Sequence, residues 1–194
     1  ISTNVTSFFR EPDHFDFVRA AVSQWDKERQ NRFRFWSAAC STGEEPYSLA
    51  MTLLEAIGRP GIDMKILATD ISSAALSTAM AGKYDDLTML RGLPAEKRNR
   101  YFTKQDNSWL VAEDVKQMVA FRKTNLQEPF LGLGRFDVVF LRNVIIYFSD
   151  DFKKDLLNRI AATLKPGGYL SYSGMNRLAS RTEAGTTVEF HYDT

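Results

Sequence analysis

Short apolar runs alternate with helical spacings along most of the chain. Five runs have the length and composition of buried strands: 33–39, 65–69, 119–124, 136–141 and 169–173. Between them, apolar residues at helical spacing predict helices over about 12–29, 46–57, 72–82 and from Asp150 through Leu164. This alternation, with short connections, predicts an α/β fold in which a mostly parallel sheet carries helices on both faces. Residues 186–192 alternate polar and apolar positions in the manner of an edge strand.

Proline, glycine and serine residues mark the ends of these elements. Pro12 can open the first helix, Gly58 closes the second, and Ser72 caps the third, which Gly82 ends. Pro166-Gly167-Gly168 is expected to turn the chain from the last helix into the last parallel strand.

The segment 83–118 interrupts the alternation and is too long for a plain connection. It holds a helical piece near 94–101 and two β-like runs, 101–104 and 109–111. We expect it to form a small inserted subdomain.

Composition narrows the class of protein. The 194 residues include 25 Lys+Arg and 24 Asp+Glu, a net charge of +1, which argues against a protein that coats nucleic acid or anionic membrane. No run approaches the roughly 18 to 20 apolar residues of a membrane span. The single cysteine, Cys40, excludes an internal disulfide and is compatible with a reducing cytoplasm. We expect its side chain to pack in the core and not to act as a nucleophile. No Cys/His cluster has metal-ligand spacing.

Candidate chemistry lies where the strands end, because ligands of open α/β sheets bind beyond the carboxyl ends of the strands. Four segments directly follow predicted strands: 40–45, 70–72, 125–126 and 142–147. Asp70 ends the second strand, where a carboxylate can accept hydrogen bonds from ribose hydroxyls. The alternative is an acid facing the positive end of the following helix.

The first loop, AACSTGEE over 38–45, favours a particular nucleoside. A dinucleotide site needs several glycines around a pyrophosphate, whereas this loop has one glycine and two acids, Glu44 and Glu45. The two carboxylates suit a cationic ligand without phosphate, such as S-adenosylmethionine, and a nicotinamide dehydrogenase is disfavoured. Alternatively, either acid caps the helix that starts near Pro46.

The segment RNVIIYF over 142–148 is the last candidate. Asn143 has no proline after it, which argues against methylation of a base nitrogen. Tyr147 and Phe148 have core packing as an alternative role, but a buried Asn143 amide would need partners.

Five motifs occur in order: TNVTSFFRE (3–11), WSAACSTGEEPYS (36–48), ATDI (68–71), RNVIIYF (142–148) and LKPGGYL (164–170). Through about residues 3–174 the chain resembles the CheR-type chemotaxis receptor glutamate methyltransferases. The resemblance implies a Rossmann-like class I methyltransferase fold. It also implies methyl transfer from S-adenosylmethionine to receptor glutamates, which yields γ-methyl esters and S-adenosylhomocysteine.

The resemblance assigns roles position by position. Cofactor contacts are expected at Asn4, Thr6, Arg10, Glu45, Asp70, Asn125, Leu126, Asn143 and Val144, with Asp70 on the ribose. Asn125 and Leu126 match adenine-side contacts, and Asn143 and Val144 match methionine-side contacts. Arg10 and Tyr147 match residues near the transferred methyl and the acceptor carboxylate. The alternative role for Arg10 is a salt bridge to Glu11 or Asp13. Phe8 and Phe9 could lie near the sulfonium of the cofactor, and the alternative for them is packing in the core.

The resemblance also bears on organisation and partners. The segment 83–118 corresponds to a family β-subdomain that in some members docks a receptor peptide. The helical N-terminal domain usual in the family is absent, and because the chain begins at Ile1 we expect a fragment or processed domain. The expected protein is a cytoplasmic monomer acting on cytoplasmic receptor helices, without nucleic acid or membrane insertion. The run 173–177 departs from the family pattern, so a catalytically weak binding or scaffold module is the alternative.

The chain is nearly neutral as a whole, but one segment carries an excess of positive charge. Across 91–104 five cations, Arg91, Lys97, Arg98, Arg100 and Lys104, face only Glu96. The excess predicts either a solvated helix face or a docking patch for a glutamate-rich receptor helix.

Overall fold

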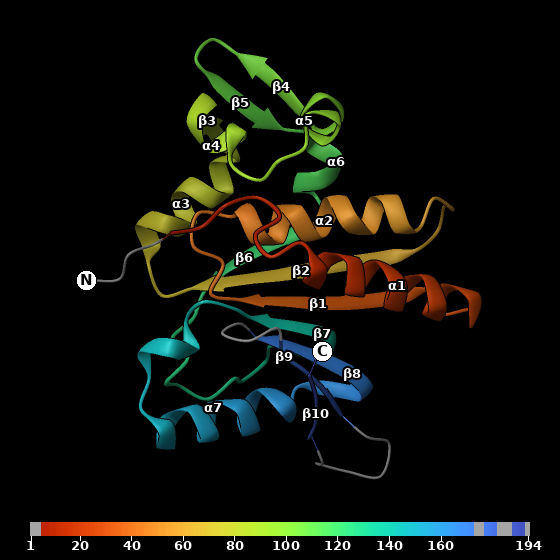
Figure 1. Ribbon diagram of the computed structural model, residues 1–194, viewed down its shortest axis with the longest axis vertical. Helices are drawn as coiled ribbons and strands as arrows, with labels where there is room; N and C mark the ends of the chain where they lie inside the picture. Colours follow the sequence, from red (N-terminus) through yellow and green to blue (C-terminus); the bar gives the residue numbers. More distant parts are fainter. Residues whose placement is uncertain (1–4, 173–176, 182–187, 193–194) are drawn as a thin grey trace.

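A computed structural model describes residues 5–172, 177–181 and 188–192 (Figure 1). Within these residues a seven-stranded sheet has the order β10-β9-β8-β7-β1-β2-β6. Its strands are β1 (Arg32–Ala38), β2 (Asp63–Asp70), β6 (Val119–Lys123), β7 (Phe136–Leu141), β8 (Leu164–Tyr172), β9 (Arg177–Arg181) and β10 (Val188–Tyr192). Strands β6, β2, β1, β7 and β8 are parallel, and β9 and β10 extend the sheet in antiparallel fashion. The predicted mostly parallel sheet is therefore confirmed.

Helices cover both faces of this sheet, as predicted. They are α1 (Asp13–Lys27), α2 (Glu44–Ala56), α3 (Ser73–Ala81) and α7 (Asp150–Ala161). Side chains alternate across β1, so Phe33 and Phe35 pack in the core with α1 and α2. Trp36 and Ala38 point to the opposite face and pack in the core with α7. The inner strands carry apolar side chains toward both faces because both faces of the sheet are covered.

The segment 83–118 forms a second body at the top of Figure 1. It contains β3 (Lys83–Asp85), α4 (Asp86–Leu90), α5 (Ala95–Tyr101), β4 (Phe102–Gln105), β5 (Ser108–Val111) and α6 (Glu113–Lys116). The strands form an antiparallel sheet of order β3-β5-β4. The sequence pattern did not predict β3, α4 or α6, which are only three to five residues long and too short to show a period.

Phe8 joins the N-terminal segment to this second body. Its fully buried ring meets Tyr84 edge to face at 5.0 Å and Phe102 at 5.4 Å between centroids. A Cβ at Gly92, where φ is 72°, would overlap the Phe8 carbonyl oxygen, so the chain passes there only as glycine. Phe8 is thus a core residue.

Three predicted boundaries need correction. Helix α7 ends at Ala161, and Leu164 belongs to β8 instead of the helix stripe. Pro166-Gly167-Gly168 lies inside β8, where the register with β7 shifts between Leu164 and Tyr169. Helix α2 begins at Glu44, two residues before the predicted start, because Gly43 adopts φ 97° and turns the chain into the helix.

In the C-terminal part of the chain, one strand was predicted and another was missed. The predicted edge strand is present as Val188–Tyr192, but β9, which separates it from β8, was not predicted. Residues 173–176 of the departing run lie outside the described residues. No helix in the described part of the chain is long and apolar enough to span a bilayer.

Candidate functional site

A cavity of about 470 Å³ lies at the left-hand edge of the sheet in Figure 1, where β1 and β2 end. The volume is within the roughly 300–1,000 Å³ of small-molecule sites. Strand β1 lies between β2 and β7, so the strand order reverses beside the cavity, at the position where open α/β sheets bind their ligands. Its walls come from the N-terminal segment and the segments that follow β1, β2, β6 and β7.

The structure brings nearly all of the predicted site residues to this cavity. Its lining includes Thr6, Arg10, Glu45, Asp70, Asn125, Leu126, Asn143, Val144 and Tyr147. Asn4 lies outside the described residues. Residues separated by more than a hundred positions in the sequence thus line one cavity.

The β1–α2 loop has an unusual backbone. Ala39, Ser41 and Gly43 have positive φ angles of 151°, 49° and 97°. A Cβ at Gly43 would lie 2.8 Å from the Tyr84 hydroxyl oxygen, and that hydroxyl donates to the Thr42 carbonyl at 2.7 Å. The loop therefore makes glycine-like turns with only one glycine, and the second body holds it in place.

Asp70 connects this loop to the start of α3. One carboxylate oxygen accepts the Ser41 N–H and the other accepts the Ser72 N–H, both at 2.9 Å. The Ser72 hydroxyl separately caps α3 by accepting the Ala75 N–H at 3.2 Å. Each Asp70 oxygen retains acceptor capacity toward the cavity, since a carboxylate oxygen has two lone pairs.

The two loop acids have different surroundings. Glu44 is buried away from the cavity, and its carboxylate accepts the Thr42 hydroxyl at 2.6 Å. Glu45 lines the cavity and accepts the Ser37 hydroxyl at 2.7 Å. Burial raises the pKa of both carboxyls, and the Arg142 guanidinium opposes that shift at Glu45. The expectation that both acids face the ligand is therefore wrong for Glu44.

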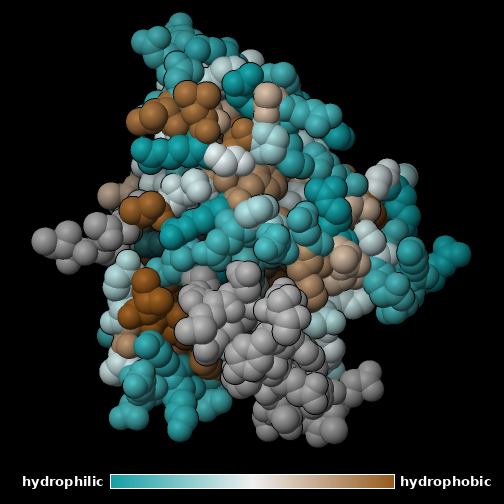
Figure 2. Space-filling model, in the orientation of Figure 1, coloured by the Kyte–Doolittle hydropathy of each residue, from teal (hydrophilic) through white to brown (hydrophobic). Residues whose placement is uncertain are grey.

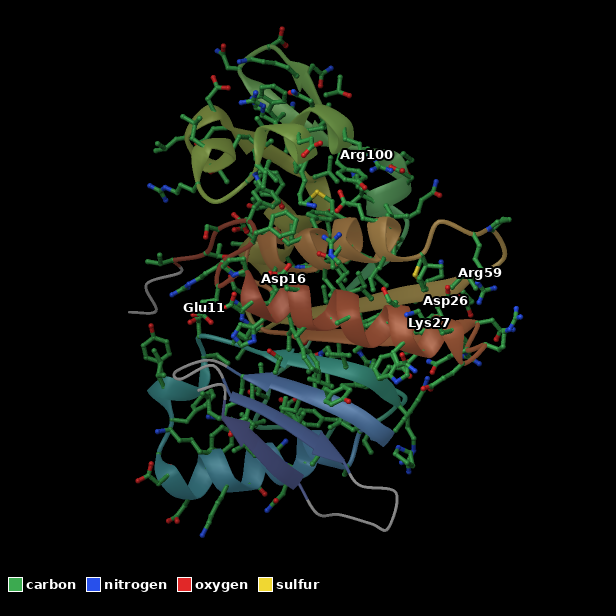
Figure 3. The ribbon with its side chains drawn as sticks, turned by 45° about the vertical axis from the view of Figure 1, so that its right-hand side comes forward. Glu11, Asp16, Asp26, Lys27, Arg59 and Arg100 are labelled. Carbon is green, nitrogen blue, oxygen red and sulfur yellow. The ribbon has the colours of Figure 1, made fainter. Side chains whose placement is uncertain are left out.

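Arg142 is the main site residue that the sequence analysis did not select. Its side chain is only 1 % exposed, and its guanidinium lies 3.5 Å from the Glu45 carboxylate and 3.4 Å from that of Glu11. It also donates to the Arg10 carbonyl oxygen. Figure 3 shows Glu11 just before α1, at the site end of that helix, with Lys27 at the other end. The available signal was a charged residue directly after a strand that is apolar except for Asp137.

His14 extends this ionic cluster behind the cavity. Its Nε2 lies 3.2 Å from the Glu11 carboxylate, and its Nδ1 contacts the Ser171 hydroxyl. Burial, with the Arg142 charge beside it, lowers the pKa of His14. Burial raises the pKa of the Cys40 thiol, in agreement with a packing role. Within the described ranges no group of three or more His, Cys, Asp or Glu side chains is arranged to hold a metal.

The segment after β7 turns one aromatic side chain outward. Tyr147 is 59 % exposed and lines the cavity, so the core alternative for this residue is wrong. Phe148 packs edge to face on Phe152 at 4.7 Å and does have a core contact. Asn143 has φ 59°, a left-handed conformation that asparagine adopts more readily than most residues.

Arg159 of α7 holds the segment that follows β6. Its guanidinium donates to the Leu126 carbonyl at 2.7 Å and to the Glu128 carbonyl at 3.2 Å. It also lies over the Phe130 ring at 4.8 Å. Asn125 accepts the Gln127 N–H at 3.0 Å, which closes a turn in the same segment. The cavity wall at Asn125 and Leu126 thus depends on a cation from another element.

The basic run over 91–104 is partly neutralised. Lys97 pairs with Glu55 at 2.6 Å, and Lys104 pairs with Asp86 at 2.9 Å. Glu55 and Asp86 lie outside residues 91–104. The excess of positive charge counted over 91–104 therefore overstates the net charge around these residues.

Comparison with known proteins agrees with the geometry. The family model described as "CheR methyltransferase, SAM binding domain" matches residues 4–192. Chemotaxis protein methyltransferase 1 of Pseudomonas aeruginosa is 44 % identical over 177 residues, covering 88 % of this chain and 65 % of the relative. Chemotaxis protein methyltransferase 1 of Vibrio cholerae is 42 % identical over 187 residues, covering 94 % and 68 %.

A solved structure supports the fold alone. The DszA carbon methyltransferase is 18 % identical with a TM-score of 0.51, over 86 % of this chain and 37 % of that one. The family model spans nearly the whole sequence, and the fold and the cavity agree with it. The chain belongs to the CheR methyltransferase family as its S-adenosylmethionine-binding domain.

Proposed function

We propose that this chain transfers methyl groups from S-adenosylmethionine to glutamate carboxylates of chemotaxis receptors and forms γ-methyl esters. The observation that carries the proposal is the composition of one cavity. Glu45 and Asp70 form part of its wall, and Arg10 and the exposed Tyr147 line the same space. Because the chain spans 65 % of the length of its Pseudomonas aeruginosa relative, the activity of the whole protein is inferred from this domain.

The residues present fit the cofactor. A carboxylate at the end of β2 suits ribose hydroxyls, and a second carboxylate, Glu45, suits a cationic ligand. Asn125 and Leu126 would form the adenine side, and Thr6, Asn143 and Val144 would contribute further contacts. When bound, the cofactor supplies a methyl group activated by a positively charged sulfur.

The protein has little acid–base work to do in this reaction. A glutamate side chain with a pKa of about 4.3 is already an anion near neutral pH, so no general base is needed. Arg10 would hold one carboxylate oxygen and leave the other free to attack, and Tyr147 would border the acceptor. The main contributions are therefore positioning and exclusion of water.

The partners follow from the same proposal. The acceptors are cytoplasmic helices of methyl-accepting receptors, and the chain acts on them as a monomer in the cytoplasm. Residues 83–118 are proposed as an inserted subdomain of a catalytic domain spanning 1–194, and this subdomain is a candidate receptor contact. Of the five cations in the run 91–104, Lys97 and Lys104 form ion pairs, which leaves Arg91, Arg98 and Arg100.

Substitution of Arg10 tests the reaction. We expect Arg10→Ala to lower kcat/KM for a receptor cytoplasmic fragment by about 10- to 150-fold, the equivalent of losing a hydrogen bond to a charged group. Transfer of radiolabelled methyl groups measures this effect. Arg122→Ala, which removes an exposed arginine that does not line the cavity, is the matched control. If the wild-type chain binds S-adenosylhomocysteine but transfers no methyl group, the scaffold alternative holds instead.

Substitution of Arg159 tests the adenine-side wall. Arg159→Ala removes two hydrogen bonds to backbone carbonyls and should weaken S-adenosylhomocysteine binding by about 1–3 kcal/mol. Isothermal titration calorimetry provides the measurement. Lys153→Ala on the same helix is the control, because Lys153 pairs only locally with Asp150. Equal affinity in the two variants would show that the segment keeps its shape without Arg159.

A further inference from the structure

Four large apolar side chains are exposed beside the opening of the cavity. Val5 is 66 % exposed, Ile71 60 %, Tyr147 59 % and Ile146 55 %. Val5, Ile71 and Tyr147 line the cavity, and Ile146 is the neighbour of Tyr147 in the short helix η1 (Ile145–Tyr147). Hydrophobic surface is visible along the same left-hand edge in Figure 2. We call these four residues the apolar rim.

The apolar rim comes from separate parts of the chain. Val5 belongs to the N-terminal segment, Ile71 follows β2, and Ile146 and Tyr147 follow β7. The core does not use these side chains, since Ile145 is the buried residue of η1, only 6 % exposed, and it packs with α7. Single exposed hydrophobic residues are ordinary, but a group of them around a ligand opening is typical of a binding surface.

The charge inside the rim restricts what docks there. Arg10 lines the cavity, so a carboxylate that enters meets a guanidinium. A wholly polar acidic segment would gain nothing from Ile71 and Ile146, and a wholly apolar one would gain nothing from Arg10. A segment that carries both kinds of side chain uses both features.

We propose that the apolar rim is the docking surface for the methyl acceptor, and that it selects glutamates flanked by apolar side chains. This inference rests on the proposed function and specifies its substrate. Apolar neighbours of the glutamate would cover the rim and exclude water from the cavity. Water exclusion strengthens the attraction between a carboxylate and a cation, because the local dielectric constant falls. Free glutamate, which has no such neighbours, would be a poor acceptor.

Ile146→Ser is the decisive variant, because Ile146 belongs to the rim but does not line the cavity. We expect the KM for a receptor cytoplasmic fragment to rise about 10-fold, the scale expected for losing a buried aliphatic contact. The dissociation constant for S-adenosylhomocysteine should not change. Leu131→Ser is the matched control, since Leu131 is 78 % exposed and lies outside the cavity lining.

A second measurement separates docking from a structural effect. Two peptides with one glutamate each, flanked by leucine in one and by serine in the other, are compared as acceptors. Wild type should prefer the leucine peptide, and Ile146→Ser should lose most of that preference. If wild type transfers methyl groups and Ile146→Ser has the same KM and the same peptide preference as wild type, the proposal for the apolar rim is overturned and the proposed function is not. Absence of transfer by wild type to any acceptor would overturn the proposed function and the rim together.

Discussion

Replacing Arg142 by methionine is expected to lower the free energy of unfolding by about 3–5 kcal/mol, the effect of removing one partner from a buried ion pair. The guanidinium is 1 % exposed and lies between the Glu45 and Glu11 carboxylates. Methionine would fill much of the volume between the Phe15 and Phe140 rings but would leave the mostly buried Glu45 carboxylate without its ion-pair partner. Urea unfolding followed by circular dichroism measures the change.

A second substitution identifies the cause of this loss. Arg142→Met combined with Glu45→Gln should recover part of the stability, because the neutral amide does not need the cation. Arg34→Met is a control, because Arg34 does not line the cavity and pairs with the half-exposed Asp63 at 2.6 Å. Its free energy of unfolding should fall by at most about 1 kcal/mol. Equal stability of Arg142→Met and wild type would mean that the cluster contributes nothing to folding.

Asp70→Ala has the largest expected effect on ligand binding. We expect affinity for S-adenosylhomocysteine to fall by at least about 1.5–3 kcal/mol, the range for one hydrogen bond to a charged group. The loss can exceed this range because Asp70 also holds Ser41 and Ser72 by their N–H groups, so both loops beside the cavity lose an anchor. Isothermal titration of the folded variant measures the affinity.

Asp63 is the matched control for Asp70. It begins the same strand, β2, that Asp70 ends, and it pairs with Arg34 away from the cavity. Asp63→Ala should therefore leave the affinity for S-adenosylhomocysteine unchanged. Unaltered affinity in Asp70→Ala as well would show that Asp70 is only a helix-terminal acid.

The elements that the sequence predicted well are those with a strong period or composition. The parallel strands and α1, α2 and α3 were found because their apolar positions repeat or run continuously. The failures lie where that signal is weak or misleading. Leu164 matched the helical period of α7, yet it belongs to β8, because Thr163 closes the helix by donating its N–H to the Ile160 carbonyl at 2.8 Å.

The candidate site shows the same division. Asp70 and Asn143 could be selected because each follows an apolar run, and strand ends of a parallel sheet meet at one edge. Glu44 and Glu45 could not be distinguished in this way. They are adjacent in the sequence, and only the direction of the first turn of α2 places Glu45 on the cavity and buries Glu44 beside Thr42.

The sequence by itself determined the order of the five parallel strands along the chain, the loops that line the cavity and the family to which the chain is similar. Those features reside in local spacing and motif, which a linear pattern records. Only the tertiary structure decided that Arg142 lies between Glu45 and Glu11, that Arg159 holds the segment after β6, and that the residues of the apolar rim come together beside one cavity. Each of these depends on residues that are distant in sequence and meet only when the sheet brings them together, so no local pattern contains them.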